Sequence, residues 1–200
     1  MRQHLILFAK APRLGSAKRR LAAELGALAA WRFHRGTLAA VARRLGGDRR
    51  WRTWLALTPD HWPGGRRLVP HALPGLAQGR GDLGQRMARA LRAPPRGPAV
   101  LIGADIPAVR PAHIAAAFRA LGHADAVFGP ATDGGYWLVG LARRRTMPGL
   151  FHNVRWSSPW ALADTLRNLP AHRRAAQVAR LHDVDTAADL VLSRLAAGAR

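Results

Sequence analysis

The apolar residues of this chain gather in short runs, separated by longer stretches with helical periodicity. The first run, His4–Ala9, is rich in Leu, Ile and Phe and precedes a loop with Pro and Gly at Ala11–Ser16. Such runs are typical of buried parallel strands. The same pattern predicts strands at Trp51–Leu57, Ala99–Gly103, Ala124–Phe128 and Tyr136–Leu141, with shorter ones at Leu68–Pro70 and Val178–Leu181.

The stretches between these runs favour helices. Ala17–Gly46 predicts a helix in two pieces, broken near Gly26, and Asp82 is a suitable N-cap for a helix at Asp82–Arg92. Further helices are predicted at Pro111–Leu121, Ser157–Leu169 and Thr186–Ala196. Alternating strands and helices indicate a three-layer α/β/α fold with a mostly parallel central sheet. No linker divides the chain, so we expect one domain over residues 1–200.

Composition removes several classes of protein. The 200 residues include no cysteine, which excludes disulfides, thiolate metal sites and thiol catalysis. The apolar run at the N-terminus is too short for a signal peptide, and no stretch approaches the roughly 18 apolar residues of a membrane helix. We therefore expect a soluble, cytoplasmic protein without a membrane partner.

The formal net charge of +21 points to anionic partners. The arginines are scattered along the chain and form no basic stripe interleaved with aromatic residues. Phosphorylated small molecules are therefore favoured over nucleic acid as partners. The only two lysines among 32 basic residues, Lys10 and Lys18, lie in the same N-terminal loop. A compact ammonium is a good point charge for a phosphate.

That loop runs from the first predicted strand into the first predicted helix. Gly15 lets the backbone turn close to a ligand, and a helix N-terminus offers free N–H donors to an anion. Lys10, Arg13 and Lys18 add cations around it. The spacing is neither a Walker A loop nor Gly-x-Gly-x-x-Gly. The loop is either a phosphate site or an ordinary basic turn.

Acidic residues are few, and three loop segments carry candidates for chemistry. Asp105 directly follows the strand Ala99–Gly103, where open α/β sheets bind ligands, and would suit Mg²⁺ or Mn²⁺. Alternatively, Asp105 caps the turn toward the next helix. Asp133, in Asp133-Gly134-Gly135, either accepts hydrogen bonds from sugar hydroxyls or belongs to a hairpin turn.

The third segment is His182-Asp183-Val184-Asp185-Thr186. Asp183 and Asp185 fall on one side of an extended chain, and Asp185-Thr186 would equally cap the last helix. The alternative role is a second carboxylate for a metal at Asp105.

Together these segments resemble a bacterial glycosyltransferase-A-like (GT-A-like) family described as radical-SAM/selenodomain-associated or arsenosugar-biosynthesis transferases. It is similar in fold to molybdenum-cofactor guanylyltransferase and phospholactate guanylyltransferase. The matching positions are Phe8, Lys10, Pro12, Gly15, Lys18, Arg20 and Leu21; Gln78, Gly81, Asp82, Leu83, Gly84, Arg86 and Met87; Gly103, Asp105 and Pro107; Gly129, Pro130, Asp133, Gly134, Gly135 and Tyr136; Trp156 and Ser157; and Asp183, Asp185 and Thr186.

The resemblance implies a GT-A fold, a nucleotide or nucleotide-sugar donor, a small-molecule acceptor and a divalent metal, Mg²⁺ or Mn²⁺. It implies phosphate contacts from the N-terminal loop (Lys10, Arg13, Gly15, Lys18, Arg20) and donor contacts near the base or ribose from Gln78, Asp82 and Arg86. Asp105 and Asp185 would hold the metal. Asp133, Gly134, Gly135, Tyr136 and Trp156 would face the acceptor or sugar.

The sequence departs from the family where Arg19 replaces Thr and Ile106 replaces Cys. It also has Asp105-Ile106-Pro107 where GT-A glycosyltransferases typically carry Asp-x-Asp. The leading interpretation is glycosyl transfer, with nucleotidyl transfer and release of pyrophosphate as the alternative. Asp105 would act catalytically through its metal, with Asp133 as the candidate base. No oligomeric state is predicted.

Overall fold

The first strand of the chain lies inside the sheet, between the next two long strands. The computed structural model describes residues 1–16, 18–62, 68 and 73–191. In it β1 (Gln3–Lys10) pairs in parallel with β2 (Trp51–Thr58) on one side and with β4 (Ala99–Gly103) on the other. The expected strand at His4–Ala9 is therefore confirmed, one residue longer at each end.

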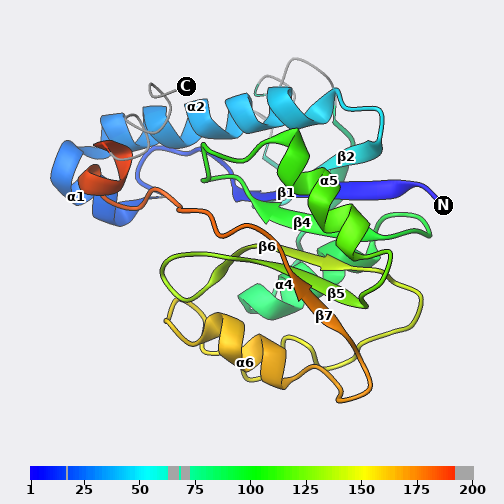
Figure 1. Ribbon diagram of the computed structural model, residues 1–200. Coiled ribbons are helices and arrows are strands. Elements are labelled where there is room, and N and C mark those ends of the chain that lie inside the picture. The colour runs from blue at the N-terminus through cyan, green and yellow to red at the C-terminus, as the bar shows by residue number, and fades with distance from the viewer. Residues whose placement is uncertain (17, 63–67, 69–72, 192–200) are drawn as a thin grey trace.

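Within the described residues, seven strands form one sheet in the order β3-β2-β1-β4-β6-β5-β7 (Figure 1). The other strands are β3 (Gly75–Ala77), β5 (Ala126–Pro130), β6 (Tyr136–Leu141) and β7 (Ala175–Gln177). Only β6 runs antiparallel to its neighbours, β4 and β5. The sheet is mostly parallel, as predicted.

Helices cover both faces of this sheet. They are α1 (Arg19–Leu25), α2 (Ala27–Gly46), α4 (Leu83–Arg92), α5 (Pro111–Ala120) and α6 (Ala161–Arg167). Alternation along β1 separates the two cores: Leu5 and Leu7 pack in the cluster that includes α2 and α5, whereas Ile6 packs with α4. Two apolar faces on one sheet account for the three layers seen in Figure 1.

The predicted helix boundaries hold best where a cap fixes them. Gly26, at a φ of 85°, separates α1 from α2. Asp82 caps α4 by accepting the backbone N–H of Gln85 at 2.7 Å, and the Gln85 side chain accepts the backbone N–H of Asp82. Thr186 accepts the N–H of Asp189 at the start of helical residues 187–191, as expected for a cap.

Three predictions need correction. The strand expected at Val178–Leu181 forms at Ala175–Gln177, because only those residues hold a regular ladder with β5; the following segment continues alongside with single contacts such as Ala131 to Leu181. The helix expected at Ser157–Leu169 begins at Ala161, after a turn in which Ser158 accepts the N–H of Trp160. Strand β3 forms in a stretch for which the sequence predicts neither a strand nor a helix.

Two further predictions extend beyond the described residues. Of the strand expected at Leu68–Pro70, residues 69 and 70 lie outside them, and Leu68 itself is helical and buried. The C-terminal part of the helix expected at Thr186–Ala196 also lies outside them. Among the described residues, no helix combines the length and the apolar character needed to cross a bilayer.

Candidate active site

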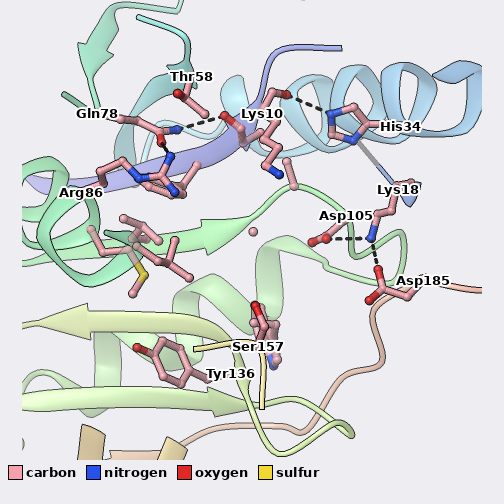
Figure 2. A pocket seen from close by; sticks show the side chains of 18 of the residues that line it. Lys10, Lys18, His34, Thr58, Gln78, Arg86, Asp105, Tyr136, Ser157 and Asp185 are labelled. Atoms are coloured by element: carbon pink, nitrogen blue, oxygen red, sulfur yellow. Dashed lines mark hydrogen bonds and ion pairs between the residues drawn. The ribbon is translucent and has the colours of Figure 1, made fainter. Parts of the chain in front are cut away.

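A cavity of about 520 Å³ opens at the carboxyl ends of β1 and β4. Parallel strands place their following loops at one edge of a sheet, so segments distant in sequence meet here. Eight of the predicted site residues line the cavity: Lys10, Lys18, Arg20, Gln78, Arg86, Asp105, Tyr136 and Asp185. Figure 2 labels all of them except Arg20. The other seven, Arg13, Gly15, Asp82, Asp133, Gly134, Gly135 and Trp156, are not part of its lining.

The cationic wall comes from the end of β1 and from the loop that follows it. Lys10 ends β1 and is exposed, and Arg20 is exposed in the first turn of α1. The loop folds on itself, because the Ser16 hydroxyl donates to the carbonyl of Arg13 at 2.8 Å and Gly15 adopts a φ of 75°. The strand–loop–helix geometry expected from the sequence is therefore present. Arg13 is exposed and is not part of the cavity lining.

Two carboxylates of the cavity lining, Asp105 and Asp185, form an acidic cluster with a third, Asp183. Asp105 follows β4, and Asp183 and Asp185 come from the segment after β7; one oxygen from each lies within 4.8 Å of the others. Burial raises the pKa of Asp183, and the charges of Asp133, Asp185 and Asp105 raise it further. Like charges gathered in this way favour a bound cation.

Lys18 supplies that cation in the present structure. Its Nζ donates to Asp105 Oδ2 at 2.9 Å and to Asp185 Oδ1 at 2.7 Å, and its side chain is only 6% exposed (Figure 2). Burial alone would lower the Lys18 pKa, but the charge of Asp105 and the hydrogen bonds to both carboxylates outweigh it and raise the pKa. The lysine predicted to bind phosphate thus lies on the carboxylates predicted to bind metal.

Gln78 and Arg86 form the wall near the ends of β1 and β2. Gln78 is fully buried, and its amide donates to the carbonyls of Ala9 at 3.0 Å and Ala56 at 2.8 Å. Arg86 donates to the Gln78 Oε1 atom at 3.2 Å. Gln78 therefore joins two strands as well as lining the cavity, whereas Asp82, from the same motif, serves as the cap of α4.

The glycine motif after β5 builds a turn at the rim. Asp133 Oδ1 accepts the backbone N–H of Gly135 at 2.9 Å, and a Cβ on Gly134 would meet the backbone of Pro159 at 2.2 Å. Tyr136 lines the cavity, with its hydroxyl 3.4 Å from Thr165; burial raises its pKa. Trp156 packs against the Tyr136 ring in the core cluster on the α4 side of the sheet.

Asp183 and His34 are among the residues of the site that the sequence does not assign to it. The sequence predicts that Asp183 lies on the same side of the chain as Asp185, and the metal ligands it predicts are Asp105 and Asp185. The alternation Asp183-x-Asp185 was a signal that both carboxylates face one side. His34 lines the cavity from α2 and contacts the Lys10 carbonyl through Nε2 at 2.9 Å; its Nδ1 is buried with no hydrogen-bond partner among the described residues. Its local sequence gives no signal.

Comparison with solved structures shows the same fold in transferases. A protein from Desulfovibrio desulfuricans G20, assigned to the nucleotide-diphospho-sugar transferases, is 28% identical; the match has a TM-score of 0.84 and covers 98% of this chain and 88% of that one. Rv0371c from Mycobacterium tuberculosis H37Rv, in complex with manganese, is 18% identical with a TM-score of 0.54, over 96% and 98% of the two chains.

CMP:2-keto-3-deoxy-manno-octonic acid synthetase in complex with CTP, at 12% identity and a TM-score of 0.57, matches over the full length of both chains. No curated protein sequence matches this chain. Residues 39–158 match the family DUF2064, whose description is "Uncharacterized protein conserved in bacteria". The resemblance to a GT-A-like family is thus confirmed: the chain belongs to the DUF2064 family and has the fold of the nucleotide-diphospho-sugar transferases.

Proposed function

We propose that the protein is a metal-dependent transferase that uses a nucleotide-sugar donor to glycosylate a small-molecule acceptor. One observation carries the proposal: a single cavity joins the cations of the β1–α1 region to the carboxylates of Asp105 and Asp185, and the Asp183 carboxylate lies beside these two. Cations suit the donor's phosphates, and clustered carboxylates suit the divalent metal that accompanies a pyrophosphate.

The acidic residues fit a hard divalent cation. Three carboxylates within reach of one point offer the oxygen ligands that Mg²⁺ and Mn²⁺ prefer, and the Lys18 ammonium already lies between two of them. Rv0371c, which shares the fold, forms a complex with manganese. When bound at Asp105, Asp183 and Asp185, such an ion would neutralise the donor's pyrophosphate and the charge on the leaving group.

The chain's own residues would bind and orient the donor. Lys10 and Arg20 face the cavity and would contact phosphate oxygens, holding the leaving group in place as negative charge builds on it. Gln78 and Arg86 would form the wall beside the nucleoside, and Tyr136 would exclude water on the opposite side of the cavity (Figure 2). Asp133 is the candidate base for the acceptor hydroxyl.

A second candidate is nucleotidyl transfer, and the origin of the carboxylates favours it. Asp105 is followed by Ile106-Pro107 and is joined by residues of the segment after β7, instead of belonging to an Asp-x-Asp pair. In glycosyl transfer the acceptor attacks the sugar carbon and a nucleoside diphosphate leaves. In nucleotidyl transfer an acceptor oxygen attacks the α-phosphorus and pyrophosphate leaves.

The released product separates the two reactions. The protein is incubated with Mg²⁺ or Mn²⁺, a panel of nucleoside triphosphates and nucleotide sugars, and candidate acceptors. Nucleoside diphosphate would support glycosyl transfer, and pyrophosphate would support nucleotidyl transfer. If no donor binds while DNA binds tightly with strong salt dependence, both candidates are wrong.

A pair of charge-matched variants tests the metal site. Asp105→Asn should abolish metal-dependent donor binding, whereas Asp48→Asn, which removes a carboxylate paired with Arg50 outside the cavity lining, should retain it. Unchanged metal affinity in Asp105→Asn would contradict the assignment of this carboxylate.

A further inference from the structure

The Lys18 side chain lies where the proposed metal would bind. Its ammonium is hydrogen-bonded to Asp105 and Asp185, which belong to different segments, and Figure 2 shows it between the two carboxylates. With 6% of its side chain exposed, Lys18 is the buried cation of the cavity, whereas Lys10 and Arg20 are exposed.

An ammonium and a divalent ion cannot both occupy the space between these carboxylates. The nitrogen lies 2.9 Å and 2.7 Å from the two oxygens, and Mg²⁺ would approach the same groups to about 2.0–2.1 Å. Two cations held this close repel each other strongly in a partly buried site. A metal that uses Asp105 and Asp185 together therefore requires the ammonium to leave.

The backbone of Lys18 is compatible with such a movement. Lys18 precedes α1 with φ 53° and ψ 50°, a left-handed conformation that is unfavourable for a residue with a side chain, and it makes no side-chain cap. The Lys18 carbonyl accepts the backbone N–H of Ala22, whereas the ammonium makes the two ion pairs across the cavity. Once these are broken, the ammonium faces the cavity that Lys10 and Arg20 also line.

We propose that Lys18 is an internal competitor of the divalent metal, which occupies the acidic site in the free protein and moves to the donor's phosphates when the metal binds. This inference rests on the proposed function. It adds that Lys18 has two positions, one on the acidic site and one on the donor's phosphates. Metal and donor then bind with positive coupling, because the metal releases the cation that the donor uses and the donor holds that cation away from the carboxylates.

The first experiment measures Mn²⁺ affinity without any nucleotide, by counting free Mn²⁺ in an EPR titration. Lys18→Met should bind Mn²⁺ at least ten-fold more tightly than the wild type, because the competing ammonium is gone. Lys10→Met is the matched control: it removes the other lysine from the same cavity, where within the described residues Lys10 has no ion pair. It should change the affinity less than three-fold, through the general field alone.

Equal or weaker Mn²⁺ affinity in Lys18→Met, or equal gains in both variants, would refute the competition while leaving the metal site intact. Absence of Mn²⁺ binding in the wild type and in both variants would refute the metal site of the proposed function, and the competition with it. In the presence of Mn²⁺, the donor affinity of Lys18→Met should fall at least ten-fold, since the lysine's contact with the donor's phosphates is lost.

A second measurement follows the wild-type chain itself and uses a variant only to assign its signals. Because the sequence has only two lysines, protein labelled with ¹³C at lysine Cε gives two side-chain signals, which Lys10→Met assigns. Saturating Mg²⁺ should shift the Lys18 signal and narrow it toward that of an exposed lysine. An unchanged Lys18 signal, under conditions where Mg²⁺ binding is shown by calorimetry, would overturn the proposal.

Discussion

Replacement of Gln78 by Met tests whether this predicted donor residue acts by contact or by position. The side chain is fully buried, donates to the carbonyls of Ala9 and Ala56, and accepts from Arg86. Met has similar length and no polar atoms, so all three hydrogen bonds are lost. At about 1 kcal/mol for each bond, the free energy of unfolding should fall by about 3 kcal/mol.

For a chain of this size, that loss corresponds to a melting temperature lower by about 6–12 °C. The assay is urea unfolding together with thermal melting, with donor affinity measured well below the transition. Gln177→Met makes the same replacement at an exposed position on β7 and should change stability by less than about 0.5 kcal/mol. A stable Gln78→Met protein that has lost donor affinity would refute the structural role and indicate direct contact with the donor.

Three further outcomes are expected. Gly84→Ala should lower the free energy of unfolding by about 1–3 kcal/mol, because the new Cβ meets the Phe151 backbone oxygen and the Trp156 ring at 2.8 Å. The control Gly36→Ala places its Cβ in open space and should not be destabilising. A Gly84→Ala protein as stable as the wild type would contradict this packing. Asp189→Asn should be less stable than the wild type above pH 4, by about 1 kcal/mol after allowance for solvent screening. Partial burial raises the Asp189 pKa, but hydrogen bonds from Thr186 and His182 outweigh it and lower this pKa to about 2. The difference in stability between Asp189→Asn and the wild type should therefore vanish as the pH falls from 4 to 2. A difference that persists in urea titrations at pH 2 would refute this. Tyr136→Phe should keep its donor affinity and lose at most about 1 kcal/mol of stability in urea unfolding. The reason is that, among the described residues, the Tyr136 hydroxyl makes a single long hydrogen bond, with Thr165. A ten-fold loss of donor affinity would instead indicate that the hydroxyl contacts the donor.

The sequence by itself determined the layers of the fold and the outline of the site. Apolar runs such as Ala99–Gly103 predicted the long strands, and Gly26 and Asp82 predicted helix boundaries, because burial, glycine torsion and capping act within a few residues. The position of Asp105 after its strand likewise placed it at the edge of the sheet where the cavity opens. Short edge strands were misplaced, since β3 and β7 form only through pairing with β2 and β5.

Only the tertiary structure decided which candidates share the cavity and what they contact there. Asp183 joins Asp105 across 78 positions of sequence, and Lys18 reaches carboxylates of two distant segments. Gln78 joins two strands in addition to lining the cavity, and Trp156, predicted to face the acceptor or sugar, packs in a core cluster. Such roles depend on contacts between segments far apart in the chain, which local pattern does not encode. The loop Lys10–Arg20 could be recognised as cationic from its residues, but the position of its buried ammonium on the acidic site followed only from the folded chain.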